Sequence, residues 1–196
     1  MFSLFIMAAS TLAPPLDYCE NFDQRLGFYN DYRAALQQSL DDAKPGQKLV
    51  FEVVEKADPE TEALRYKETW ILKSINKKTG AVKVEALRQA TGAQDSKDLI
   101  DWQVKIGDAV DPKPALENCS HPYMYAYTFT RGQEKLAQGT VPTLTRQQFE
   151  IGNVKLVQTV SSKVPLGLVK EHMEVLNRKT GKVSSRDLKL VSYSSK

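Results

Sequence analysis

The chain is poor in the residues that most enzymes use for chemistry. Its 196 residues include two histidines, His121 and His172, and two cysteines, Cys19 and Cys119. The cysteines form no C-x-x-C pair, so the usual signature of zinc-ribbon and thioredoxin-type sites is missing. His121 lies two residues after Cys119, but two candidate ligands do not make a metal site. The sequence therefore predicts a protein without a metal site or a cofactor.

The motifs of common catalytic and nucleotide-binding loops are missing as well. The chain contains no G-x-S-x-G, no Walker loop, no G-x-G-x-x-G and no H-E-x-x-H. We therefore predict that the protein is not an enzyme. The remaining enzymatic hypothesis would use Cys119 or His121. It requires an exposed free thiol, which alkylation of Cys119 without denaturant would detect.

Charge of one sign does not dominate the chain. There are 27 Lys and Arg against 24 Asp and Glu, which gives a formal net charge of +3, and the two signs are interspersed. A protein that binds nucleic acid usually concentrates its basic residues on one face or along one helix. The pattern is instead typical of a mixed, solvated surface, and we expect no nucleic-acid partner.

Long apolar runs are scarce. The first thirteen residues, MFSLFIMAASTLA, are apolar and end in small residues, like the core and cleavage site of a secretory signal. No Lys or Arg precedes this run, so a short segment that packs on the domain is the alternative. Thirteen residues are too few to cross a bilayer, which takes about 20. We predict a periplasmic or secreted protein with a signal peptide or apolar segment at 1–13, a single β-rich globular domain over 14–196, and no integral membrane span.

Export also bears on the two cysteines. In an oxidising compartment Cys19 and Cys119 are candidates for one disulfide, which would tie the N-terminal segment to the middle of the chain. The alternative is two unrelated thiols, because the distance between the two Cα atoms decides whether a bond can form.

One helix is predicted near the N-terminus, over residues 17–43. Apolar residues there recur at steps of three and four, which places them on one face of a helix. Lys44-Pro45-Gly46 ends the run, because proline lacks the backbone donor. The opposite face is mixed rather than rich in Lys and Arg, so the helix is expected to lie on a core. The stripe comprises Phe22, Leu26, Tyr29, Tyr32 or Arg33, Leu36 and Leu40.

After Gly46 the apolar period changes from 3.6 to 2. Apolar and polar residues alternate, which predicts strands with one buried face and one solvated face. Residues 88–120 are less regular, and Leu99–Val104 within them read either as a short strand or as a helical turn. Gly132, Gly139 or Pro142, and Gly152 are expected to separate the later strands. The predicted strands are 49–53, 64–72, 82–86, 123–129, 133–140, 142–150, 153–161, 166–176 and 182–194.

A five-residue turn occurs twice. Asn76-Lys-Lys-Thr-Gly80 and Asn177-Arg-Lys-Thr-Gly181 each join two predicted strands, 101 residues apart. An internal duplication would explain the repeat. The alternative is that turn chemistry alone selects asparagine to start the turn and glycine to close it.

The predicted strand faces carry many aromatic residues. In a curved sheet with a filled interior they would be core, because aromatic side chains dominate core burial. In a curved sheet that leaves space, they would line an apolar pocket for a lipid or another hydrophobe, with tyrosine hydroxyls as polar contacts. The candidate ligand-binding residues are Tyr66, Trp70, Tyr123, Tyr125, Tyr127 and Phe129.

Two features resemble known exported proteins. A helix followed by a run of antiparallel strands resembles the bacterial periplasmic lipoprotein carriers of the LolA/LolB type. The segment V-P-L-G-L-V-K at 164–170, followed by L-K-L-V-S-Y at 188–193, is similar to the tail of secreted bacterial β-rich proteins. The resemblance implies an α+β, mostly β fold, in which an incurved antiparallel sheet (a half-barrel) has one N-terminal helix packed on it. By analogy it also implies a hydrophobic cargo.

The sequence thus favours a non-enzymatic exported protein that binds a small hydrophobic ligand or lipid on a concave sheet. The alternative is a structural or interaction module of the cell envelope with a filled core and no ligand. A cavity lined by the aromatic residues would favour the first, and a filled interior the second. The oligomeric state has no signature in the sequence.

Overall fold

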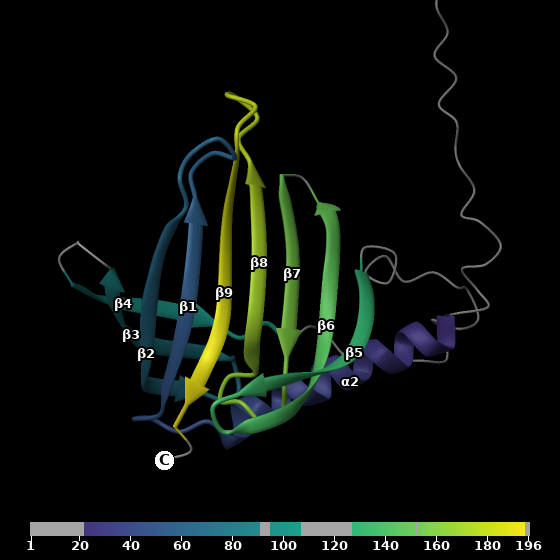
Figure 1. The fold of residues 1–196 in the computed structure, drawn as a ribbon. Coiled ribbons are helices and arrows are strands. Elements are labelled where there is room, and N and C mark those ends of the chain that lie inside the picture. The colour runs from purple at the N-terminus through teal and green to yellow at the C-terminus, as the bar shows by residue number, and fades with distance from the viewer. Residues whose placement is uncertain (1–21, 91–94, 107–126, 152, 195–196) are drawn as a thin grey trace, which may run out of the picture.

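The computed structural model describes residues 22–90, 95–106, 127–151 and 153–194. Within them, one helix packs on a single antiparallel sheet of nine strands that is not closed into a barrel (Figure 1). The α+β, mostly β fold is therefore confirmed. The elements are α2 (Phe22–Asp42), β1 (Lys48–Lys56), β2 (Leu64–Asn76), β3 (Ala81–Ala90), β4 (Ser96–Gln103), β5 (Tyr127–Leu136), β6 (Gly139–Ile151), β7 (Val154–Val160), β8 (Leu168–Leu176) and β9 (Val183–Tyr193).

The sheet consists of two meanders joined at its centre. Its strand order is β4-β3-β2-β1-β9-β8-β7-β6-β5, so every neighbouring pair is consecutive in sequence except β1 and β9. In Figure 1, β2–β4 turn away behind the plane of β1 and β9, which gives the sheet its incurved form. We call the face that packs toward α2 the inner face, and the opposite one the outer face.

The helix matches the predicted stripe. It lies against β5, β6 and β7 and buries five of the predicted side chains, while residues 17–21 and the side chain of Phe22 lie outside the described residues. Gly46, at a φ of +90°, turns the chain from the helix region into β1, and its amide donates to the carbonyl of Leu72. Within the described residues no helix is both long and apolar enough to cross a membrane. The buried face consists of Leu26, Tyr29, Tyr32, Leu36 and Leu40.

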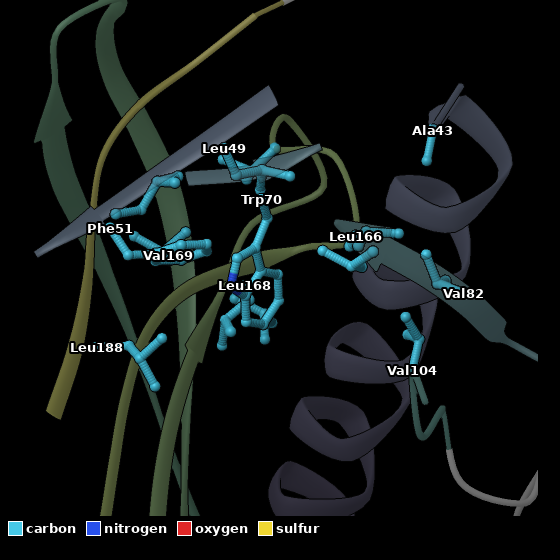
Figure 2. Packing of buried hydrophobic residues seen from close by; sticks show 14 of the residues in the cluster. Ala43, Leu49, Phe51, Trp70, Val82, Val104, Leu166, Leu168, Val169 and Leu188 are labelled. Atoms are coloured by element: carbon cyan, nitrogen blue, oxygen red, sulfur yellow. The ribbon is translucent and has the colours of Figure 1, made fainter. Parts of the chain in front are cut away.

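The core follows the predicted alternation on the inner face. Phe51 and Trp70 are almost fully buried, and their ring centroids lie 4.9 Å apart. Trp102 of β4 continues the aromatic contact, 5.0 Å from Trp70. Figure 2 shows Trp70 among the aliphatic side chains that fill the space between the sheet and α2, with Leu168 nearby. This part of the interior is filled rather than hollow.

The repeated turn has the same geometry in both places. The Asn76 side-chain oxygen accepts from the amides of Lys78 and Thr79, and Gly80 has a φ of +73°. Asn177 likewise accepts from the amides two and three residues on, and Gly181 has a φ of +69°. The left-handed conformation favours glycine at the closing position. The two turns close the β2–β3 and β8–β9 hairpins.

The break predicted at Gly132 does not occur, and of the alternatives Gly139 and Pro142 the break lies at Gly139, where β6 begins. Gly132 lies inside β5 and Pro142 inside β6, where Pro142 pairs with Gln133. The pairing of β6 with β7 begins only at Leu144, so Pro142 is paired with β5 alone. Proline lacks an amide hydrogen, but no hydrogen bond to β7 is lost at this position. Of the two readings of Leu99–Val104, the strand is correct, because β4 pairs with β3 over its whole length.

The connection between β7 and β8 is buried beneath the helix. Leu166 has a φ of +61° and Gly167 a φ of +79°, and the carbonyl of Gly167 accepts from the amide of Ser161. A Cβ atom at Gly167 would lie 2.8 Å from Ser39 Oγ and 2.9 Å from Leu36 Cδ2 of α2. Glycine at this position therefore lets the loop approach the helix closely.

Substituting Gly167 by alanine tests this close approach. We expect G167A to lower the free energy of unfolding by about 2–4 kcal/mol, because it adds overpacking against α2 to the cost of a positive φ. Gly181 has a similar φ, but a Cβ atom added there would meet nothing within 4 Å, so G181A should cost only about 1 kcal/mol. Urea unfolding measures both variants. Equal losses would show that the contact with α2 contributes nothing.

Candidate ligand-binding cavity

A cavity of about 370 Å³ lies on the inner face, between α2, the end of β4 and strands β6–β9. It begins where the filled core ends, and Leu166 and Leu168 belong to both. Two side chains of α2, Tyr32 and Leu36, form part of its wall. The apolar wall also includes Trp102, Val104, Leu156, Val160, Leu166, Leu168 and Met173.

Strand register places a row of polar side chains at the same cavity. Arg146 of β6 pairs with Gln158 of β7, which pairs with Glu171 of β8. Because paired residues of adjacent antiparallel strands point to the same face, all three side chains lie on the inner face. The cavity thus has a largely apolar wall and, on β6–β8, a polar end; Gln103 and Lys105, at the end of β4, also line it.

These polar groups form a directional chain of hydrogen bonds. Arg146 Nη2 donates to Gln158 Oε1 over 2.6 Å, and Gln158 Nε2 donates to Glu171 Oε2 over 2.6 Å. The Arg146 guanidinium lies over the Tyr32 ring, 5.0 Å from its centroid, and the Tyr32 hydroxyl lies 3.4 Å from Gln158 Oε1. The helix and three strands therefore hold the polar end in one arrangement.

A buried carboxylate organises the neighbouring part of the inner face. Glu68 of β2 is fully buried and accepts from Trp70 Nε1 at 2.5 Å and from Arg88 Nε at 3.0 Å. Arg186 Nη2 of β9 lies 3.3 Å from both of its oxygens. Two cations and an indole compensate the cost of burying the charge. Glu68 thereby links β2 to β3 and, across β1, to β9.

Arg186 extends this network to a second carboxylate. Its Nε lies 3.0 Å from Glu55 Oε1, and the Tyr66 hydroxyl donates to the same oxygen over 2.8 Å. Burial, followed by this hydrogen bond to Glu55, raises the pKa of Tyr66 to about 12, so the phenol is a donor throughout the neutral range. Arg186 also lines the cavity, so the network borders it.

A second hollow, of about 450 Å³, continues the surface toward the β1–β2 and β8–β9 ends. Glu55, Leu64 and Val175 line it, and it shares Met173 and Arg186 with the first cavity. The two hollows therefore adjoin along the inner face, and we call them together the groove. Leu64 at its rim is a large apolar side chain that is 54% exposed.

Of the six aromatic residues predicted to bind a ligand, the structure describes three side chains. Trp70 packs in the filled core, Tyr66 contacts Glu55, and Phe129 packs edge-on against Tyr29 and Tyr32 of α2. None of the three is among the described lining residues of the cavity. Tyr123, Tyr125, Cys19, Cys119, His121, residues 1–13 and the side chain of Tyr127 lie outside the described residues, so their roles remain predictions.

The polar groups of the inner face were not predicted from the sequence, although their position carries a signal. Glu68 shares its parity with Tyr66 and Trp70, and Arg186 shares its parity with Leu188. In an alternating strand, a charged residue in the apolar register is predicted to be buried. The buried face therefore also carries charged residues, which the alternation of apolar and polar residues did not predict.

His172, the histidine that the structure describes, lies on the outer face. His172 Nδ1 lies 2.7 Å from Asp187 Oδ1, and its Nε2 lies 3.1 Å from Glu174 Oε1. Lys155 contacts the same glutamate at 3.2 Å. In the part of the chain that the structure describes, no group of three or more His, Cys, Asp or Glu side chains is arranged to hold a metal ion. This cluster is an outer-face ion-pair network.

The sequence matches no protein family and no curated protein. Among solved structures, it is similar to MucB in complex with MucA(peri), at 11% identity, 85% coverage of this chain and a TM-score of 0.46, and to MucB alone, at 11%, 85% and 0.44. This chain spans 55% and 59% of those two chains.

Two further similar structures carry names of the type that the sequence resembles. An outer membrane lipoprotein-sorting protein domain from Vibrio parahaemolyticus is 14% identical, with 85% of this chain and 92% of that chain covered and a TM-score of 0.25. A LolA superfamily protein from Nitrosomonas europaea is 10% identical, with 83% and 92% covered and a TM-score of 0.27. These identities and TM-scores are low, and no activity or partner is carried over from these proteins to this chain.

Replacing Glu68 by glutamine tests the buried network. We expect E68Q to lower the free energy of unfolding by about 2–3 kcal/mol, because two arginines lose a shared buried partner; partial exposure of Arg88 keeps the loss below that of a wholly buried pair. E174Q removes the same charge from the outer face and should cost less than about 1 kcal/mol. Urea unfolding compares the two variants, and equal losses would contradict a central role for Glu68.

His172 should make stability depend on pH. Partial burial lowers the pKa of His172, but the hydrogen bonds to Asp187 and Glu174 outweigh it, so the pKa lies above the usual 6.5. The folded protein then binds more protons than the unfolded chain, so this stabilisation is complete below about pH 6.5 and is lost as the pH rises through the raised pKa.

Urea unfolding of wild type and H172Q between about pH 5.5 and 8.5 measures this dependence. The free energy of unfolding of wild type should fall more steeply with rising pH than that of H172Q. Parallel curves would show that His172 is not responsible. Glu174 does not confound the comparison, because the hydrogen bonds from His172 and Lys155 hold its pKa below the usual 4.5.

Proposed function

We propose that this protein binds a small hydrophobic or amphipathic molecule, such as a lipid, in the inner-face cavity beneath α2. The cavity itself is the observation that carries the proposal. Its volume of about 370 Å³ lies within the range of about 300–1,000 Å³ that is typical of small-molecule sites. An apolar wall with a few polar groups at one end is the usual composition of such sites.

The driving force would be burial of apolar ligand surface. Each Å² of apolar surface removed from water contributes about 25 cal/mol, so about 200 Å² would contribute about 5 kcal/mol before the cost of ordering. The groove offers a longer path than the cavity alone, lined by Leu64, Met173 and Val175 among polar side chains. Such a path suits an extended chain better than a compact ligand.

The helix is the element that would have to move for exchange. Tyr32 and Leu36 form part of the cavity wall, and Gly167 of the buried loop is in close contact with Leu36. A displacement of α2 would therefore open the cavity and loosen the β7–β8 connection together. Covering elements that open and close commonly limit the rates of uptake and release.

Other parts of the proposal rest on the sequence. The apolar segment at 1–13 supports an exported, periplasmic or secreted protein, and the lack of catalytic motifs supports a binding protein rather than an enzyme. No cofactor or nucleic acid is part of the proposal. A lipid carrier of the cell envelope is the particular role that these features favour.

A structural or interaction module of the envelope is the second candidate. The observation that favours it is the filled core in which Trp70, one of the predicted ligand-binding residues, packs between Phe51 and Trp102. In that case the remaining cavity would be a packing imperfection, and the protein would take up no hydrophobe from solution.

A cavity-filling substitution separates the two candidates. Leu156 lines the cavity, whereas Val157, the next residue of β7, pairs with His172 and faces outward. We expect L156W to weaken binding of a fluorescent fatty-chain probe by at least tenfold, about 1.4 kcal/mol, because indole takes up the ligand's space. V157W adds comparable bulk on the outer face and should change binding by less than about twofold.

Extraction of the purified proteins with organic solvent, followed by mass spectrometry, tests independently whether they carry a bound hydrophobe. A co-purifying hydrophobe that L156W lacks and V157W retains is the expected result. Failure of wild type both to bind the probe and to yield an extracted hydrophobe would refute the carrier proposal and leave the envelope module. Equal binding by L156W and V157W would place the binding site elsewhere.

A further inference from the structure

The charged groups at the polar end of the cavity balance one another. Within the described residues, the cavity and the network that borders it contain three carboxylates and three guanidinium groups. Lys105 also lines the cavity and Asp98 lies 3.6 Å from Arg88, but these two exposed side chains of opposite charge are screened by solvent and are left out of the count. The six groups are Glu55, Glu68, Glu171, Arg88, Arg146 and Arg186.

Two of the arginines are committed to carboxylates of the protein. Arg186 lies 3.0 Å from Glu55 and 3.3 Å from Glu68, and Arg88 lies 3.0 Å from Glu68. An anionic ligand that recruited Arg186 would have to share it with these two carboxylates. A further anion would therefore gain little from either of these two arginines, because each already faces a carboxylate of the protein.

Glu171 is the acidic group that faces the cavity most directly. It is 8% exposed, lines the cavity, and accepts one hydrogen bond at Oε2 from the neutral amide of Gln158. Because Arg146 donates to Gln158 Oε1, the amide is oriented with its nitrogen toward Glu171. Within the described structure, the second oxygen of Glu171 receives no side-chain hydrogen bond and remains an acceptor for a ligand.

On the basis of the proposed function, we infer that the ligand is an uncharged amphiphile whose head group carries a hydroxyl, which donates to Glu171. A carboxylate or phosphate head would lie beside the Glu171 carboxylate in a place that solvent screens poorly. An ammonium head would meet Arg146 and Arg186. A hydroxyl satisfies the acceptor without adding charge, so the chemical class is that of monoacylglycerols and long-chain alcohols.

Competition against the fluorescent fatty-chain probe tests this ranking in the wild-type protein. A monoacylglycerol, a fatty acid and an alkylamine of equal chain length are compared at about pH 8, where a carboxylic acid and an alkylamine are both charged. We expect the monoacylglycerol to bind at least about tenfold more tightly than either charged ligand. A fatty acid or alkylamine that binds as tightly as the monoacylglycerol would overturn the inference and leave the proposed function intact.

Two matched variants identify the group responsible. E171Q removes one negative charge from the cavity, so the fatty acid should gain about tenfold in affinity relative to the monoacylglycerol. E174Q removes the same charge from the outer face of the same strand and should leave the ranking unchanged. An unchanged ranking in a folded E171Q would overturn the assignment of Glu171.

The two failures are distinguishable. If none of the three ligands displaces the probe and none binds directly, the proposed function fails and this inference with it. If the ligands bind but their affinities do not depend on the charge of the head group, only this inference fails. The wild-type ranking stands independently of whether E171Q folds, which urea unfolding reports.

Discussion

The pairing of β1 with β9 is the constraint on which the rest of the structure depends. It joins the first strand of one meander to the last strand of the other, over the register from Leu49 opposite Tyr193 to Lys56 opposite Ser185. Glu68 reinforces the junction, because it binds Arg88 on one side and, across β1, Arg186 on the other. Without this junction the inner face would be two separate surfaces, and the wall of the groove would be interrupted.

The cavity follows from where the core stops filling the space under the helix. Phe51 and Trp70 with Trp102 occupy the inner face beside β1–β4, whereas smaller aliphatic side chains such as Val160 and Leu168 line β7 and β8. The β7–β8 loop contacts α2 closely at Gly167 and so holds the helix over β7 and β8, where the side chains are smaller. Space therefore remains where β7 and β8 contribute aliphatic side chains, with Tyr32 and Trp102 also in the wall and polar groups on β6–β8 at one end.

Much of the fold could be predicted from the sequence. The period of 3.6 before Gly46 and of 2 after it distinguishes α2 from the strands, and local turn chemistry locates both N-x-x-T-G hairpins. The break expected at Gly132 was wrong, and of the alternatives Gly139 and Pro142, Gly139 is correct because β6 begins there. A proline interrupts a strand only where a neighbouring strand would accept a hydrogen bond from its backbone nitrogen. The neighbours of a strand depend on the strand order of the whole sheet, which the local sequence does not contain.

The sequence by itself determined the α+β class, the helix, and which side of β1, β2 and β3 is buried, because these depend on residues a few positions apart. Only the tertiary structure decided that β1 meets β9, that Gln158 connects Arg146 to Glu171, and that Trp70 fills the core instead of lining a cavity. The physical reason is distance along the chain. Such contacts join residues on different strands, and alternation specifies the face of a side chain but not its neighbour.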